Sequence, residues 1–144
     1  MKKEEIIARM DQLNAERKRI EETTRILVER FVNEVCGGEF YVPYFYPGHF
    51  EVNHKDQELP AFNVYIDYID WNDQTKAKME VNMAGKSSFE VCKGSNYEKE
   101  YLAFADFLRN VEKIKDTVTN CYISCNKMCD EYRHLMQLRD ALDK

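Results

Sequence analysis

The sequence predicts an α+β domain in which two long helices pair along their length and an antiparallel sheet separates them in the chain. Near both ends, apolar residues recur at alternating steps of three and four, whereas the middle alternates with a period of two. Gly37-Gly38 and Gly94-Ser95-Asn96 mark the boundaries between these patterns. We therefore expect a single domain over residues 1–144, with a helix over 1–36, an antiparallel sheet over 39–93 and a helix over 97–142.

The two helical segments carry matching apolar seams. The first seam consists of Ile6, Met10, Leu13, Arg17, Ile20, Thr24, Leu27 and Phe31. The second consists of Phe107, Val111, Ile114, Val118, Cys121, Cys125, Met128, Tyr132, Leu135, Arg139 and Leu142. An antiparallel alignment places Met10 on Leu135 and Leu27 on Val118. Because such an alignment brings apolar residues together along both seams, it predicts an antiparallel coiled coil.

The central segment predicts a meander of four or five antiparallel strands. Its first part, 40–46, is rich in aromatic residues, but Pro43 lacks a backbone donor and places that part at an edge or a bulge. The later strands are expected over 49–53, 62–68, 77–83 and 88–91. Alternation gives the sheet an apolar face, which the final helix covers, and a polar face. The polar face is expected to carry His49, Glu51, Asn53, Asn63, Tyr65, Asp67, Glu80, Asn82 and Glu90.

Both helices carry a third apolar position in several heptads. These positions hold Leu108, Tyr122, Cys129 and Met136 on the last helix and Ile7, Val28 and Val35 on the first. Three apolar positions per heptad are typical of a helix within a bundle, so something beyond the helical pair must cover this flank. We expect a second copy of the chain there, which predicts a homodimer with Leu108, Tyr122, Cys129 and Met136 at its interface. In the alternative interpretation, the helices bend back over the sheet.

Composition and charge narrow the classes of function. The chain is 44% hydrophobic and 33% charged, and its formal net charge is −5 with the basic residues interleaved among acids, which disfavours nucleic-acid binding. Residues 1–5 lead into an amphipathic helix without an apolar signal segment, and no apolar run is long enough to cross a membrane. The 5 cysteines are scattered, which favours free thiols in a reducing compartment. These features predict a cytoplasmic protein.

No pattern of residues in the sequence predicts a reaction or a cofactor. Cys121, Cys125 and Cys129 share one helix face, which is one way to build a soft-metal or redox site. However, no Cys-x-x-Cys pair is present, and Cys121 and Cys125 lie in the seam, where a free cysteine behaves as a small hydrophobic residue. The 3 histidines have no nucleophile or carboxylate at a spacing that forces them together. We therefore assign no catalytic or metal-binding residue.

The aromatic edge and the acidic sheet face predict a binding surface for another protein. Tyrosine and tryptophan are favoured anchors at interfaces, and a single sheet layer cannot bury aromatic side chains on both faces of an edge segment. The expected partner-binding residues are Tyr41, Tyr44, Tyr46, Glu51, Asp67, Trp71 and Glu80. We expect a non-enzymatic protein-interaction module: a homodimeric adaptor, chaperone or inhibitor, such as a phage-encoded inhibitor of a host system. The alternative is a small-molecule or nucleotide-binding protein or enzyme, with its site on the polar sheet face beside Tyr65 and Glu80 or in a dimer groove.

Overall fold

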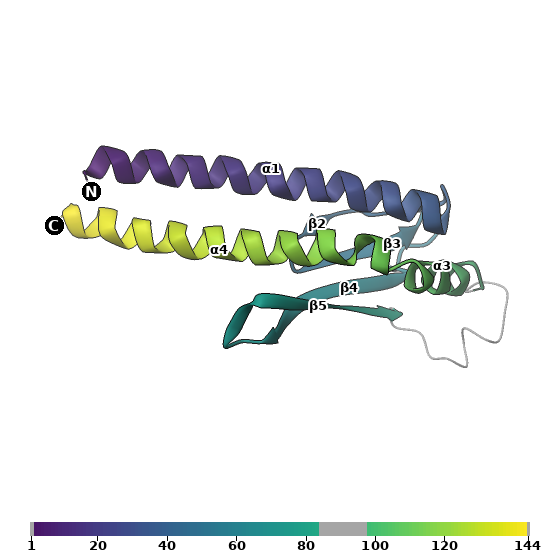
Figure 1. Ribbon diagram of the computed structural model, residues 1–144. Coiled ribbons are helices and arrows are strands. Elements are labelled where there is room, and N and C mark those ends of the chain that lie inside the picture. The colour runs from purple at the N-terminus through teal and green to yellow at the C-terminus, as the bar shows by residue number, and fades with distance from the viewer. Residues whose placement is uncertain (1, 84–97, 144) are drawn as a thin grey trace.

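The computed structural model describes residues 2–83 and 98–143 of the chain. Its two long helices, α1 (Lys3–Cys36) and α4 (Glu112–Leu142), run side by side in opposite directions, so the two ends of the chain lie together (Figure 1). An antiparallel sheet and a shorter helix, α3 (Glu98–Arg109), lie at the other end of this pair. The predicted α+β fold with paired terminal helices is confirmed. Beyond the sheet, the two helices continue alone as a stalk.

Helix α1 is uninterrupted because its sequence contains no glycine or proline between Lys3 and Cys36. It ends where the sequence predicts. Gly37 adopts φ 100°, a conformation that favours glycine, and its amide donates to the carbonyl of Asn33.

The helical seam follows the predicted alignment in the stalk. Met10 and Leu135 are buried in one apolar cluster with Ile6 and Leu13. Nearer the sheet the pattern drifts, because an ideal helix gains about 20° per heptad relative to a seven-residue repeat. Leu27, expected on the seam, is therefore 39% exposed, whereas Val28 turns toward the sheet and is fully buried.

The helix expected over 97–142 is observed as two helices, because the chain tightens at Asn110 and Val111. The amide groups of Lys113 and Ile114 donate to carbonyls only three residues earlier, a pattern typical of a 3₁₀ turn. The side-chain amide of Asn110 donates to the carbonyl of Asp106 at 2.8 Å and occupies an acceptor at the end of α3. As a result α3 packs against α1 and β5 and does not extend the stalk.

The described strands form one antiparallel sheet. They are β1 (Phe40–Tyr41), β2 (Phe45–Tyr46), β3 (His49–His54), β4 (Phe62–Asp70) and β5 (Asp73–Met83). The order is β1-β3-β4-β5, and β2 pairs with the opposite end of β3 from β1. Pro43 therefore interrupts an edge segment, as predicted. The strand expected over 88–91, together with Glu90, lies outside the described residues.

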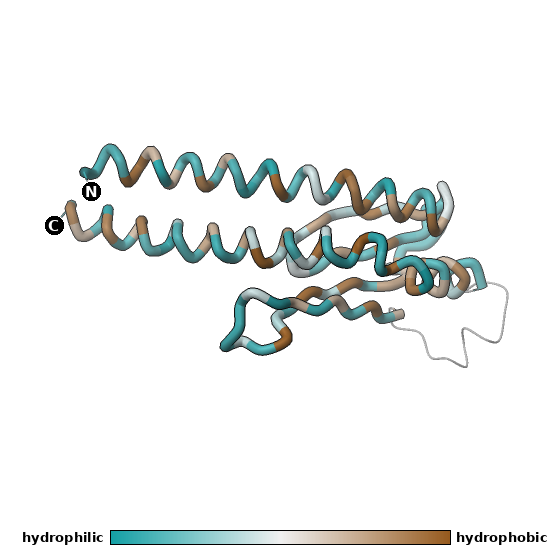
Figure 2. The backbone as a smooth tube through the Cα atoms, in the orientation of Figure 1, coloured by the Kyte–Doolittle hydropathy of each residue, from teal (hydrophilic) through white to brown (hydrophobic). Residues whose placement is uncertain are grey.

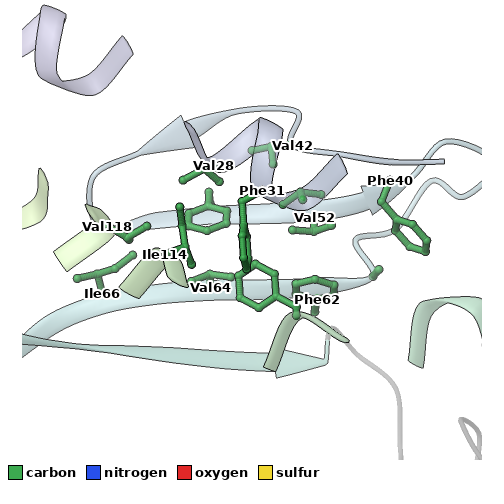
Figure 3. Close-up of a cluster of buried hydrophobic side chains, with 14 of the residues drawn as sticks. Val28, Phe31, Phe40, Val42, Val52, Phe62, Val64, Ile66, Ile114 and Val118 are labelled. Atoms are coloured by element: carbon green, nitrogen blue, oxygen red, sulfur yellow. The ribbon is translucent and has the colours of Figure 1, made fainter. Parts of the chain in front are cut away.

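The main apolar core lies between the sheet and the helices. Val28, Phe31 and Val32 of α1 pack over Phe50, Val52, Phe62 and Val64, and Ile114 and Val118 of α4 complete the layer. Figure 3 shows Phe31 pointing from α1 toward the strands that carry Val64 and Phe62. Figure 2 shows hydrophobic segments recurring between hydrophilic ones along both long helices. The described helices cover one face of the sheet, here called the inner face, and leave the opposite, outer face to the polar residues (Figure 1).

Candidate functional site

The outer face brings aromatic, polar and acidic side chains into register across the sheet. Tyr46 lies opposite His49, His49 opposite Tyr65, and Tyr65 opposite Glu80. The next row places Glu51 opposite Asn63 and Asn63 opposite Asn82. Because side chains on a strand alternate between the two faces, all of these point away from the helices. We call the following residues the outer-face cluster: Tyr44, Tyr46, His49, Glu51, Asn63, Tyr65 and Glu80.

Stacking and hydrogen bonds hold the centre of the outer-face cluster. The His49 ring stacks on Tyr65 with centroids 4.6 Å apart and an interplanar angle of 13°. The ring of Tyr44 contacts both Tyr46 and His49, at centroid distances of 5.3 and 5.6 Å. The Tyr44 hydroxyl and His49 Nδ1 lie 3.3 Å apart, as do His49 Nε2 and Asn63 Oδ1. A neutral His49 with its proton on Nε2 satisfies both hydrogen bonds.

The outer-face cluster is acidic. Partial burial and the nearby Glu51 carboxylate raise the pKa of Tyr44, because both disfavour a second negative charge at this position. Glu80 forms an exposed ion pair with Lys78 at 3.4 Å, so its charge is partly balanced. Tyr46 and Tyr65 remain 62% and 44% exposed. The face thus presents tyrosine rings beside carboxylates, a chemistry suited to contact with lysine and arginine side chains.

Three residues of the predicted partner-binding set are not part of the outer-face cluster. Trp71 is 64% exposed in the β4–β5 turn, where its ring packs edge-on against Tyr68 of the inner face at 5.2 Å. Tyr41 is exposed in β1, opposite Asn53 at the far end of β3. Asp67 is exposed, but its carboxylate accepts hydrogen bonds from the backbone amide of Tyr68 and the hydroxyl of Tyr122. Tyr44, Tyr46, Glu51 and Glu80 are the predicted residues that the fold brings together.

Tyr122, which was predicted to lie at a dimer interface, is buried within the chain. This residue is only 8% exposed, because its ring packs edge-on against Tyr68 at 5.0 Å and its hydroxyl donates to Asp67 at 3.2 Å. The chain's own sheet therefore covers this flank of α4, as the alternative interpretation expected. Leu108 is exposed on α3, on the far side of the break, whereas Cys129 and Met136 are half-buried along the stalk. The four predicted residues do not form one continuous surface.

The described cysteines are free thiols. Cys121 and Cys125 are buried with their sulfur atoms 3.9 Å apart, as expected of seam residues. Hydrogen bonding to Cys121 and burial raise the pKa of the Cys125 thiol. Burial also raises the pKa of Cys36, to about 12. Within residues 2–83 and 98–143, no group of three or more histidine, cysteine or acidic side chains is placed to hold a metal ion.

Several grooves border α4, and two of them share Asn120 and Ser124 in their lining. One, of about 360 Å³, lies between α4 and the β4–β5 hairpin. Its lining includes Tyr68 and Gln74 from the hairpin and Ile123 and Lys127 from α4. The other, of about 460 Å³, runs along the junction of α1 and α4 between Thr23 and Ser124. No helix in the described part of the chain combines the length and apolar character that a membrane span requires.

Sequence reasoning placed His49, Asn63 and Tyr65 on the polar face but not in the predicted partner-binding set. Their link to Tyr44 depends on strand register, which alternation alone does not provide. Asn53 was expected on the same face, yet it is buried beside β1. No protein-family model, curated protein or solved structure matches the chain.

Proposed function

We propose that the chain is a non-enzymatic protein-interaction module whose outer-face cluster binds a basic surface on another protein. The observation that carries this proposal is the exposure of Tyr46 and Tyr65 beside Glu51 and Glu80, on a face that the described helices leave open. Exposed tyrosines contribute large contact areas at interfaces and lose little conformational entropy on binding. An adaptor, a chaperone or an inhibitor would each use such a surface.

The hydrogen bonds within the cluster support binding to a rigid partner surface. Tyr44 and His49 restrain each other, and stacking restrains Tyr65. Side chains already held in place lose less freedom on association, so more of the contact energy contributes to affinity. The carboxylates add attraction to a basic partner, which weakens as salt screens the charges. The free thiols of the described residues agree with a cytoplasmic site of action.

The test compares tyrosines of similar exposure on different surfaces. Partners retained by the immobilised chain are identified, and the affinity of the dominant one is measured for Tyr65→Ala and Tyr46→Ala. Each substitution should weaken binding by about tenfold or more, because it removes an aromatic anchor. Tyr101→Ala on α3 is the control, since Tyr101 is 46% exposed and Tyr65 is 44% exposed. Equal affinities for all three variants would contradict the proposal.

Trp71 requires a separate measurement because it lies at the hairpin tip. If the partner extends from the outer-face cluster to the β4–β5 turn, Trp71→Ala should cost about 2 kcal/mol of binding free energy. The thermal stability of this variant should change little, since Trp71 is 64% exposed. A large loss of stability with unchanged affinity would assign Trp71 to the packing of Tyr68 instead.

The second candidate function is binding of a small molecule or nucleotide on the same face. The parallel His49–Tyr65 stack, with the Asn63 amide beside it, favours this candidate because flat rings and amides contact nucleobases. A thermal-shift screen separates the candidates. Stabilisation by a nucleotide that Tyr65→Ala abolishes would support a ligand site, and its absence with an intact protein partner would support the interaction module.

A further inference from the structure

Helix α1 carries an exposed surface on the side away from the sheet. Successive residues of a helix are about 100° apart, so Val32, nine positions after Thr23, lies on the opposite face. Val32 is fully buried in the core, and the Thr23 side therefore faces outward. The neighbours of Thr23 on the helix surface include Arg19, Ile20, Ile26 and Leu27, and the charged residues Glu16 and Arg30 lie two turns away on either side. We call Thr23, Ile20, Leu27, Glu16 and Arg30 the α1 flank.

The α1 flank borders the groove of about 460 Å³ at the junction of α1 and α4. Its α1 side is lined by Arg19, Ile20, Thr23, Thr24 and Leu27, and its α4 side is lined by Thr117, Asn120 and Ser124. Apart from Arg19, the polar side chains that line the groove are short, which leaves room for an apolar side chain from outside. Leu27 is 39% exposed at its rim. A helix that lies along α1 would fill this groove.

The flank is complementary to itself. A two-fold axis that passes beside Thr23, perpendicular to α1, relates two α1 helices that run antiparallel. A residue of one copy that precedes Thr23 by a given number of positions then lies level with the residue of the other copy that follows Thr23 by the same number. Glu16 is seven positions before Thr23 and Arg30 is seven positions after it, so two Glu16–Arg30 ion pairs form across the axis. Among the described residues, neither side chain lies within ion-pair distance of an opposite charge, although Glu16 is close enough to Arg9 to help raise the pKa of that arginine. Arg25, in contrast, pairs with Glu22 and Glu29.

The same axis also pairs the apolar residues. Ile20 is three positions before Thr23 and Leu27 is four positions after it, so Ile20 of one copy lies beside Leu27 of the other. Both residues are on the side of α1 that borders α4. The two Ile20–Leu27 pairs therefore occupy the two grooves, and Thr23 at the axis is small enough to allow close approach of the helices. Charge and shape thus both favour a second copy of this chain as the occupant.

We propose that the α1 flank is a two-fold interface that joins two copies of the chain in a four-helix arrangement of α1 and α4. This interface replaces the one expected at Tyr122, which the sheet covers. The sheets lie on the opposite side of α1 from Thr23, so both outer faces remain accessible. The dimer then presents two binding faces, and a partner with two matching sites gains affinity from simultaneous contact.

The experiment measures self-association by sedimentation. The wild-type chain should sediment as a dimer, and Leu27→Glu should sediment as a monomer, because it places a carboxylate in each groove. Ile7→Glu is the matched control. Ile7 lies on the same helix and is also 39% exposed, but it lies 16 positions before Thr23 and so faces away from the flank. This variant should remain dimeric.

A charge exchange tests the pairing itself, even if Leu27→Glu fails to fold. Glu16→Arg places two arginines together at each end of the interface and should raise the dissociation constant about tenfold or more. Adding Arg30→Glu to that variant restores opposite charges and should return the constant to near its wild-type value. A monomeric wild-type chain, which would leave the flank to a helix of another protein, overturns the proposal. The proposal is also overturned if Leu27→Glu and Ile7→Glu both sediment as dimers. It is likewise overturned if the double variant has a dimer dissociation constant no lower than that of Glu16→Arg.

Discussion

Replacing Tyr122 by alanine should destabilise the monomer and leave its assembly unchanged. The ring is 8% exposed, packs edge-on against Tyr68 at 5.0 Å and lies against Gly48, where an added Cβ would approach the ring to 3.4 Å. Removing a buried aromatic side chain typically costs 3–5 kcal/mol. We expect about 3 kcal/mol here, because the hydroxyl end reaches the exposed Asp67. At a few degrees per kcal/mol for a domain of this size, the melting temperature should fall by about 10 °C.

A second substitution distinguishes the contribution of the Tyr122 ring to stability from that of its hydroxyl. Tyr122→Phe removes the 3.2 Å hydrogen bond to Asp67 and should cost about 1 kcal/mol or less, since water can solvate the exposed carboxylate. Urea unfolding followed by circular dichroism gives both free energies, and light scattering gives the size of each variant. A Tyr122→Ala variant as stable as the wild type, but dissociated into monomers, would refute this reasoning and restore Tyr122 to a subunit interface.

Two further predictions concern the helical pair. Cys121 and Cys125 should react slowly with a thiol reagent in the native chain and rapidly after unfolding, because both are buried in the seam; stoichiometric zinc lost in Cys125→Ser would contradict this. Hydrogen bonding to Arg9 lowers the pKa of Glu131 below its ordinary value of 4.5, so the folded state holds this carboxylate ionised to lower pH than the unfolded state does. The pair therefore contributes stability above pH 4.5 that is lost as pH falls through the folded pKa. Arg9→Gln should flatten the fall in unfolding free energy between about pH 5 and 3, and an unchanged slope would exclude a contribution from the pair.

The candidate site was only partly predictable. Alternation assigns Glu51, Asn63 and Tyr65 to one face, because side chains on a strand must point to opposite sides in turn. It does not say which of them meet. The His49–Tyr65 stack depends on the register of β3 against β4, and the hydrogen bond between His49 and Tyr44 depends on how the chain crosses Pro43.

The sequence by itself determined the order of helical and strand segments and the alternation of side chains along the strands. Helical spacing, the glycines after Cys36 and the period-two segment follow from local geometry, and they suffice to predict paired helices that flank an antiparallel sheet. Local geometry also predicted that Pro43 breaks an edge segment.

Only the tertiary structure decided which surfaces those elements leave exposed. Tyr122 and Val28 have the spacing of residues on an outer helix flank, yet the sheet packs against both and buries them. Leu27 has the spacing of a seam residue, yet helical drift carries it to the surface beside Thr23. Spacing determines the angle of a side chain around its own helix, but burial depends on what lies at that angle. That neighbour is set by the packing of strands and helices distant in the chain.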